Sequence, residues 1–227
     1  GAMNLIDVAI DCGVRKVVAL STDKASSPIN LYGASKFVSD KLFISGNSYA
    51  GSMDTSFCVV RYGNVMGSRG SVIPFFLQNL DSQELPITDE RMTRFMITLD
   101  QGVELVWKAM QDMVGGEIYV KKIPSMRVVD IATAVAPEKR QRIVGIRPGE
   151  KLHEQMIGHE DARYTYEYDS YYKILPAIHD WYLDESRIKD GKLVKEGFSY
   201  TSDNNSDWMT VDTLRDWISR NQGEILK

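Results

Sequence analysis

Tyr32 and Lys36 are the two residues whose types and spacing most directly point to chemistry. Residues four apart lie on one face of an α-helix, so the ammonium group lies beside the phenol. An ammonium near a phenol favours the phenolate, which acts as a general base toward a hydroxyl group. Any exposed helix can carry such a pair, so the pair alone is a weak signal. Its position strengthens the signal, because Thr22 follows a preceding apolar run and supplies a hydroxyl that we expect to meet the phenol.

Two short apolar runs, residues 17–20 and 57–60, must position these groups. Continuous apolar runs of this length are typical of strands buried on both faces, as in a parallel sheet. The segment 31–46 between them has the pattern of a helix, and polar residues follow each run. We therefore predict two adjacent parallel strands with Tyr32 and Lys36 on the connecting helix. This is the α/β class with a Rossmann-like, doubly wound parallel sheet, in which ligands bind at the carboxyl ends of the strands.

The elements after residue 84 are shorter and more mixed. We predict strands at 85–88, 117–120 and 142–146 and helices at 100–113, 127–136 and 210–220. The aromatic-rich stretch 164–182 is interpreted as core and loop packing. These patterns predict two regions: residues 1–84 as part of a nucleotide-binding domain with the catalytic residues, and residues 85–227 as a smaller mixed α/β region that binds substrate.

Composition excludes several classes of protein. Of the 227 residues, 43% are hydrophobic and 26% charged, and the net charge of −4 gives no basic surplus for nucleic acid. Cys12 and Cys58 form neither a disulfide framework nor a metal-binding spacing, and the three histidines lie apart, so no metal site is expected. No apolar run approaches the ~20 residues of a membrane span, and no export signal is seen. We expect a cytoplasmic protein.

Six motifs occur in a fixed order between residues 1 and 160. They are Ser21-Thr22-Asp23-Lys24-Ala25, Asn30-Leu31-Tyr32-Gly33-Ala34-Ser35-Lys36, Arg61-Tyr62-Gly63-Asn64-Val65, Gly67-Ser68-Arg69-Gly70-Ser71-Val72, Ile87-Thr88-Asp89 with Met92-Thr93-Arg94-Phe95, and Arg147-Pro148-Gly149-Glu150-Lys151. Through them the chain resembles the inverting UDP-N-acetylglucosamine 4,6-dehydratases, which are extended short-chain dehydrogenase/reductases of bacterial polysaccharide biosynthesis. The Thr-Asp-Lys element distinguishes this family from its relatives, because retaining dehydratases carry Asp-Glu at this place and 4-epimerases lack the pair.

The resemblance implies a reaction cycle on one bound NADP. Tyr32, helped by Lys36 and Thr22, takes the proton of the sugar 4-hydroxyl while hydride leaves C4. Lys24 then removes the C5 proton, and Asp23 protonates the departing 6-hydroxyl. Hydride returns to C6, and reprotonation from the other face inverts C5. A lysine base must be neutral for part of the cycle, which requires burial or a nearby cation such as Lys36. The implied product is a UDP-4-keto-6-deoxy-amino-sugar for surface or flagellar glycans of the pseudaminic-acid type.

The resemblance also implies which residues bind the ligands. Paired arginine donors clamp a diphosphate, a glutamate accepts from a ribose hydroxyl, and a strand edge at residues 85–88 lies along the uracil. The implied cofactor-binding residues are Ser21, Tyr32, Lys36 and Val65. The implied substrate-binding residues are Lys24, Asn64, Arg69, Ile87, Thr88, Arg94, Arg147 and Glu150. The expected partners are UDP-N-acetylglucosamine or a similar UDP-sugar and further copies of the chain in a homo-oligomer.

The sequence departs from the family at its start. The family opens with a strand and a glycine-rich turn whose following helix holds the cofactor pyrophosphate. The glycines at 63, 67 and 70 have a different spacing. We therefore expect that this chain lacks the N-terminal part of the nucleotide domain and is inactive by itself. Two alternatives stay open: a UDP-sugar 4-epimerase or other extended reductase, which needs no acid/base pair at 23–24, and a non-catalytic fragment that binds nucleotide sugars or oligomerises.

Overall fold

The computed structural model describes residues 1–225, which form two compact units. The first unit contains Gly1–Tyr62, Asp100–Lys122 and Gln155–Tyr200. The second contains Gly63–Leu99, Ile123–Glu154 and the described residues from Thr201 to Ile225. The two units thus interleave along the sequence. The division into residues 1–84 and 85–227 concerns function and stays a prediction.

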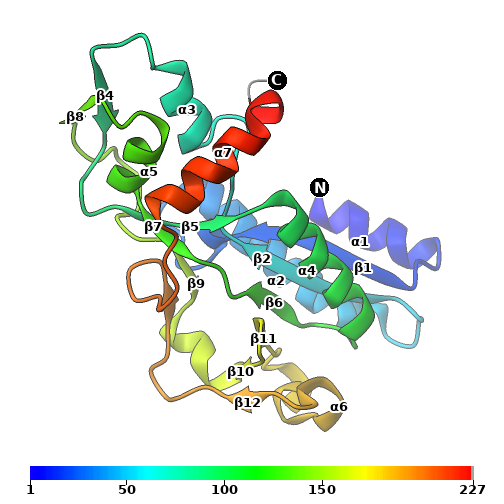
Figure 1. Ribbon diagram of the computed structural model, residues 1–227. Helices are drawn as coiled ribbons and strands as arrows, with labels where there is room; N and C mark the ends of the chain where they lie inside the picture. Colours follow the sequence, from blue (N-terminus) through cyan, green and yellow to red (C-terminus); the bar gives the residue numbers. More distant parts are fainter. Residues whose placement is uncertain (226–227) are drawn as a thin grey trace. The chain divides into compact units, whose positions relative to one another are not determined.

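A mixed sheet forms the centre of the first unit (Figure 1). Its strand order is β1-β2-β6-β11-β10-β12. The bounds are Lys16–Thr22 for β1, Ser56–Tyr62 for β2, Ile118–Lys121 for β6, Tyr171–Ile174 for β11, Thr165–Glu167 for β10 and Lys192–Leu193 for β12. Strands β1, β2 and β6 are parallel, with Leu20 opposite Val60. The predicted pair of adjacent parallel strands is therefore confirmed, and so is the α/β class.

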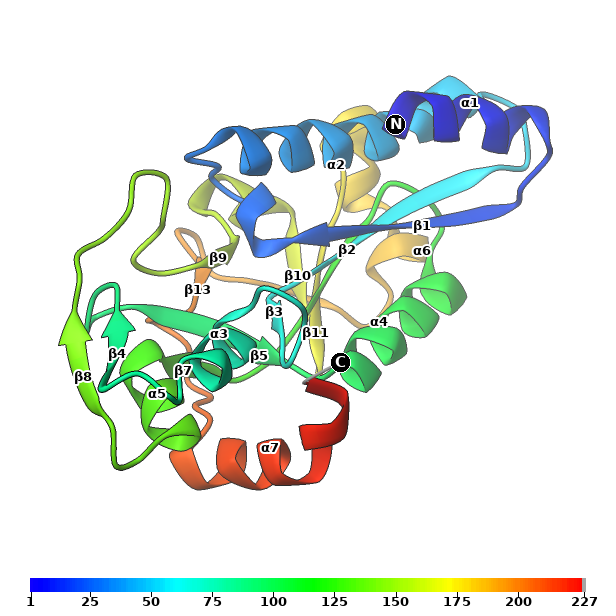
Figure 2. The ribbon, with the colours of Figure 1, turned by 90° about the horizontal axis from the view of Figure 1, so that it is seen from above.

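Helices cover both faces of the parallel strands (Figure 2). They are α1 (Ala2–Asp11) and α2 (Leu31–Ala50) on one face and α4 (Leu99–Asp112) on the other. Side chains of a strand alternate between faces. Phe57 of β2 meets Phe43 of α2 with ring centroids 6.2 Å apart, whereas its neighbour Cys58 packs with Leu105 and Ala109 of α4. This double burial explains why residues 57–60 of β2 are continuously apolar, as predicted.

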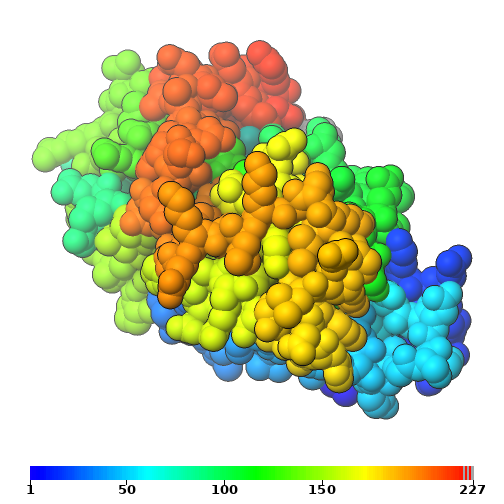
Figure 3. Space-filling view, turned by 90° about the horizontal axis from the view of Figure 1, so that it is seen from below, coloured from blue at the N-terminus to red at the C-terminus, as the bar shows by residue number. Residues whose placement is uncertain are grey.

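The segment 164–182 packs into the core, as predicted, with Tyr166, Tyr168 and Tyr171 buried, but it is not mainly loop. It forms β10 and β11, which extend the sheet in the antiparallel direction. Tyr168 donates its backbone N–H to the carbonyl of Tyr171, which closes a tight turn between the two strands. The strands are only three and four residues long, so neither shows a periodic pattern that distinguishes it from a loop. The region that includes them, yellow to orange in Figure 3, covers a face of this unit.

The second unit is built from short strands and three packed helices. Strands β3 (Asn64–Val65), β5 (Thr93–Ile97) and β7 (Ser125–Arg127) form one small sheet, and β4 (Glu84–Ile87) pairs in parallel with β8 (Arg140–Ile143). Helices α3 (Val72–Gln78), α5 (Val128–Val135) and α7 (Val211–Ile225) pack together. Their core includes Met96, Ile131 and Leu214. The strand predicted at 142–146 lies at 140–143. The strand predicted at 85–88 and the helix predicted at 127–136 are confirmed to within two residues. The helix predicted at 210–220 begins as expected but extends to Ile225.

Short elements complete the fold. They are the 3₁₀ helices η1 (Asp23–Ala25), η2 (His159–Tyr164) and η3 (Ile178–Leu183), helix α6 (Glu185–Ile188), and strands β9 (Gln155–Ile157) and β13 (Tyr200–Thr201). Across residues 1–225, none of the helices combines the length and the apolar character needed to cross a membrane.

Candidate active site

The Thr22-Asp23-Lys24 turn lies at the carboxyl end of β1, where η1 begins. The Asp23 side chain is completely buried. Its Oδ1 accepts hydrogen bonds from the Thr22 hydroxyl at 2.8 Å and from the Lys24 Nζ at 3.0 Å. Its Oδ2 is also buried and has no hydrogen-bond partner. The predicted acid and base are therefore in direct contact, and one carboxylate oxygen is left to take a further donor.

The first turn of α2 approaches this acid/base turn closely. Asn30 caps the helix, because its Oδ1 accepts the backbone N–H of Gly33 at 2.8 Å. A Cβ atom built on Gly33 would lie 2.5 Å from the carbonyl oxygen of Lys24. Only glycine permits that approach, which brings the helix with Tyr32 and Lys36 against η1. All five predicted catalytic residues thus belong to one unit, with Thr22 at the end of β1, Asp23 and Lys24 on η1, and Tyr32 and Lys36 on α2.

The connection from η1 to α2 has an unusual backbone. Ser27 has a φ of 47°, in the left-handed region that non-glycine residues rarely occupy, and Pro28 follows it. Such conformations cluster at functional sites, where the surrounding structure holds them in place. Here the connection is only five residues long, so the strained turn lets the chain reverse from β1 into α2 within that length.

Residues that fit a nicotinamide cofactor lie at the same end of β1. The Ser21 hydroxyl is buried and has no hydrogen-bond partner, and the Tyr32 side chain is 55% exposed at the start of α2. The hydroxyl groups of Ser21 and Tyr32, and the ammonium group of Lys36 on the same helix, suit the ribose hydroxyls and the carboxamide of such a cofactor. Within residues 1–225, no cluster of His, Cys, Asp and Glu side chains is arranged to hold a metal ion.

The second unit carries the predicted diphosphate-binding residues. Arg147 is exposed, and its Nη1 lies 4.0 Å from Oε1 of Glu150. The other oxygen, Oε2 of Glu150, is buried without a hydrogen-bond partner, which suits an acceptor for a ligand hydroxyl. Arg94 is largely engaged within the protein, because its guanidinium donates to the carbonyls of Thr93 at 2.7 Å and Leu152 at 3.1 Å. Arg94 therefore ties the segment after Glu150 to β5.

The remaining predicted binding residues differ in their accessibility. Asn64 and Val65 are half-buried in β3, and Arg69 is exposed in the turn that follows. Thr88 is half-buried. Ile87 is completely buried, and its carbonyl accepts the N–H of Val144, because β4 pairs with β8. The side chain of Ile87 thus belongs to the core of the second unit. The binding roles of all these residues stay predictions.

Sequence reasoning missed one buried ion pair of the first unit. Asp40 of α2 and Arg61 of β2 lie with Oδ2 and Nη2 3.1 Å apart. The available signal was the position of Asp40 one helical turn after Lys36, on the same side of the helix. Arg61 was noted only as part of its motif, because a pairing across 21 positions leaves no local pattern.

Helices on both faces of parallel strands, with Thr22 at the end of β1 and Tyr32 and Lys36 on the helix that contacts the turn after it, define a Rossmann-type fold of the kind found in short-chain dehydrogenase/reductases. The family model described as "Polysaccharide biosynthesis protein" matches residues 1–176, and the chain belongs to this family.

Individual relatives agree with that family. The chain is 51% identical to the UDP-N-acetylglucosamine 4,6-dehydratase (inverting) of a Campylobacter jejuni strain, over 98% of this chain and 69% of the relative. It is 38% identical to the UDP-glucose 4-epimerase of Rickettsia canadensis, over 90% of this chain and 61% of the relative. Among solved structures, Pen from Bacillus thuringiensis is similar with a TM-score of 0.85 and 33% identity, over 100% of this chain and 67% of that one.

Proposed function

We propose that the complete natural protein is a C5-inverting UDP-N-acetylglucosamine 4,6-dehydratase, a hydro-lyase that uses a nicotinamide cofactor. The observation that carries the proposal is the buried Asp23 carboxylate in contact with the Lys24 ammonium, on a turn packed against the helix of Tyr32. An enzyme that only oxidises and reduces a sugar needs no such second acid/base pair. The identity of 51% to a relative with this printed name supports the same reading.

Each residue of the turn and the helix has a role in this proposal. Tyr32, with Lys36 and Thr22, takes the proton of the 4-hydroxyl. A nicotinamide cofactor held by Ser21, Tyr32 and Lys36 would supply the acceptor for the hydride of C4 and the donor of hydride to C6. Transfer of a proton from the Lys24 ammonium to the Asp23 carboxylate leaves a neutral Lys24, which takes the C5 proton that the 4-ketone has made acidic, and a protonated Asp23. Asp23 gives a proton to the 6-hydroxyl, so that the C6–O bond breaks and water leaves. The 3.0 Å contact between Asp23 and Lys24 offers a direct path by which these two groups exchange a proton.

The proposal extends to cofactor, assembly and location. NADP is the proposed nicotinamide cofactor. A homo-oligomer is supported by apolar side chains exposed on α1 and α2 of the first unit, among them Val8 at 58% and Val38 at 54%. Sedimentation of the purified protein tests the oligomer. A cytoplasmic location is supported by the two free cysteines, of which Cys12 is exposed.

The product formed from UDP-N-acetylglucosamine tests the proposed activity. We expect the complete natural protein, incubated with NADP in D₂O, to give a 4-keto-6-deoxy product and to incorporate deuterium at C5. The Lys24→Ala variant is expected to lose both dehydration and C5 exchange and to keep NADP binding. Tyr32→Phe is expected to block the first oxidation instead. NMR of the sugar protons follows each step.

A matched lysine serves as the control. Lys41 is exposed on α2, two helical turns after Gly33. Lys41→Ala is expected to leave turnover unchanged. Near-normal turnover of the Lys24→Ala variant would contradict the assignment of Asp23 and Lys24. Formation of UDP-N-acetylgalactosamine as the sole product would favour the 4-epimerase alternative.

A further inference from the structure

Arg61 joins three elements of the first unit. Its Nη2 lies 3.1 Å from Oδ2 of Asp40 on α2, and both side chains are only 4% exposed. Its Nη1 donates to the backbone carbonyl of Met156 on β9 at 2.6 Å. A single guanidinium on β2 is therefore attached at once to the helix that carries Tyr32 and to β9.

Stability alone gives a poor account of this pair. Moving two charges out of water is costly, and replacing a buried ion pair with apolar residues of similar volume is often neutral or stabilising. The Nε of Arg61 is buried and has no hydrogen-bond partner, which adds to that cost. A planar guanidinium does, however, fix the direction of its donors, so it sets the geometry of the groups that it binds.

The groups that Arg61 binds lead to both parts of the candidate active site. Asp40 lies one helical turn after Lys36 and two turns after Tyr32, so the three share one side of α2. Met156, which accepts the other hydrogen bond of Arg61, belongs to β9, and β9 packs against η1, which carries Asp23 and Lys24.

We infer that Asp40 and Arg61 are positioning residues that hold the Tyr32–Lys36 helix and the Asp23-Lys24 turn in a fixed mutual geometry. Arg61 fixes the rotation of α2 about its axis through Asp40, and it fixes β9 through Met156. Both the Tyr32 phenol and the Asp23-Lys24 turn must reach one sugar, and that reach depends on their mutual geometry. This inference rests on the proposed function for its kinetic consequence and on the contacts alone for its structural consequence.

A double variant tests the inference without leaving a buried charge unpaired. Asp40→Leu combined with Arg61→Met removes the connection and keeps similar volume. In the complete natural protein we expect a melting temperature within a few degrees of the wild type, a kcat reduced at least 30-fold and a KM for UDP-N-acetylglucosamine changed less than threefold. Arg61→Lys keeps the charge but not the fork of donors, and it is expected to reduce kcat by about tenfold.

A second buried pair of the same sheet provides the control. Lys173 and Asp112 lie with Nζ and Oδ2 2.7 Å apart and have no part in the proposed chemistry. Lys173→Met with Asp112→Leu is expected to leave kcat within twofold. A kcat within threefold of wild type for the Asp40→Leu, Arg61→Met variant would overturn the inference. If that variant does not fold, an unchanged kcat for Arg61→Lys overturns it equally.

Hydrogen exchange separates this inference from the proposed function. In the 227-residue chain we expect the Asp40→Leu, Arg61→Met variant to exchange the amides of Gly33 and Ser26 at least tenfold faster, because these amides hold the ends of the two linked elements. The Lys173→Met, Asp112→Leu control is expected to leave them unchanged. A wild-type protein without dehydratase activity would refute the proposed function only. Unchanged exchange in the first variant would refute the positioning role only.

Discussion

Gly33 lies so close to Lys24 that a Cβ atom on Gly33 would be 2.5 Å from the Lys24 carbonyl oxygen. Such a separation is impossible for real atoms, so Gly33→Ala must push α2 away from the acid/base turn. We expect a loss of about 1–3 kcal/mol in the free energy of unfolding, as for other overpacked sites. Urea denaturation of the 227-residue chain measures this loss.

Gly102 provides the matched control for that variant. It also lies inside a helix of the first unit, but a Cβ atom there meets nothing within 4 Å. Gly102→Ala is expected to stabilise the protein by about 0.5–1 kcal/mol, since alanine favours the helical backbone. Equal effects of the two substitutions would contradict the close approach of Gly33 to Lys24.

We expect the 227-residue chain to bind UDP weakly and NADP negligibly. The sequence contains no glycine-rich turn for the cofactor pyrophosphate, and the remaining hydrogen bonds contribute only about 1–3 kcal/mol each. Micromolar binding requires roughly 8 kcal/mol, so calorimetry is expected to show negligible binding of NADP. Weak binding of UDP is expected through Arg147 and Glu150, whereas the donors of Arg94 are engaged with backbone carbonyls of the protein. Tight NADP binding would reveal a cofactor site that these residues do not form.

Glu150 gives that experiment a single-residue test. Its buried Oε2 has no hydrogen-bond partner, so a ribose hydroxyl gains an acceptor there. We expect Glu150→Gln to weaken UDP binding by about fivefold to tenfold, which corresponds to about 1–1.4 kcal/mol, the range of a typical hydrogen bond, because glutamine keeps an acceptor oxygen but loses the charge. Glu160, an exposed residue paired with Arg163, is the control, and Glu160→Gln is expected to bind UDP as the wild type does.

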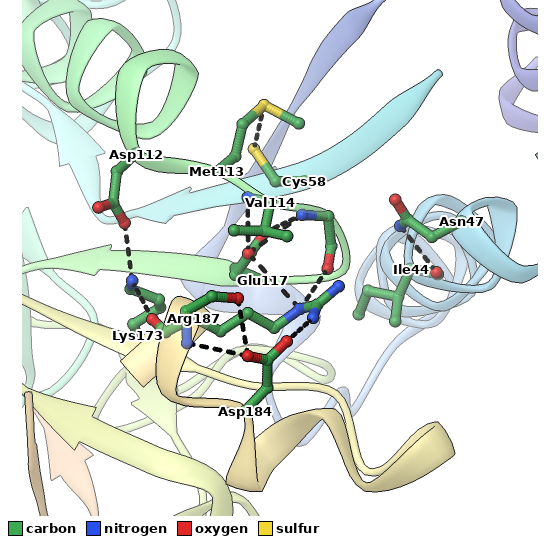
Figure 4. Close-up of polar contacts among 12 residues, drawn as sticks. Ile44, Asn47, Cys58, Asp112, Met113, Val114, Glu117, Lys173, Asp184 and Arg187 are labelled. Carbon is green, nitrogen blue, oxygen red and sulfur yellow. Dashed lines mark hydrogen bonds and ion pairs between the residues drawn. The ribbon is translucent and has the colours of Figure 1, made fainter. Parts of the chain in front are cut away.

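Acid stability depends on Asp112, which lies in a buried polar cluster of the first unit (Figure 4). Burial by itself raises the pKa of its carboxyl, but hydrogen bonds from Lys173 and Lys189 outweigh burial and lower the pKa from 3.8 to about 2. A pKa lowered on folding gives stability that is present above the unfolded value and is lost as the pH falls through the folded value. The stability contributed by Asp112 is therefore lost between about pH 4 and pH 2.

The Asp112→Asn variant checks this dependence. The difference in unfolding free energy between wild type and variant is expected to be largest above pH 4 and to shrink toward pH 2. Urea denaturation at several pH values measures it. Asp54→Asn changes an exposed aspartate paired with Arg15 and is expected to show little difference at any pH. A pH-independent difference for Asp112→Asn would show that the ion pair with Lys173 is not responsible.

The two thiols are expected to differ in reactivity. Cys58 is completely buried and donates to the sulfur of Met113, and burial raises the pKa of its thiol, whereas Cys12 is exposed. Because the thiolate is the reactive form, iodoacetamide at pH 8 is expected to label one cysteine in the native protein and two in urea. Mass spectrometry counts the labels. Cys12→Ser is expected to abolish native labelling, and labelling that persists in this variant would show that Cys58 is accessible.

The sequence by itself determined the parallel strands, the helix between them and the catalytic motifs. The apolar run at 57–60 lies in a strand that is completely buried, and that burial imposes continuous apolar composition on a local segment. The run at 17–20 also forms a strand of the parallel sheet, but it lies at the sheet edge and is only half-buried, with Leu20 54% exposed, so the expected burial on both faces is wrong for β1. The motifs are equally local, since Thr22, Asp23 and Lys24 are adjacent and Tyr32 and Lys36 are one helical turn apart. Local composition and spacing are what a sequence displays directly.

Tertiary structure alone decided the contacts between distant segments. The strand at 171–174 pairs with β6, whose residues lie 50 to 56 positions away in sequence, and the strand at 165–167 pairs in turn with β11. The same holds for the pairing of β4 with β8, which buries Ile87 although its motif suggested a ligand contact. Asp40 becomes notable only beside Arg61, and Gly33 only beside Lys24. The physical reason is that each of these depends on which surfaces meet in the folded chain, and short strands, single charges and single glycines carry no periodic signal of their partners.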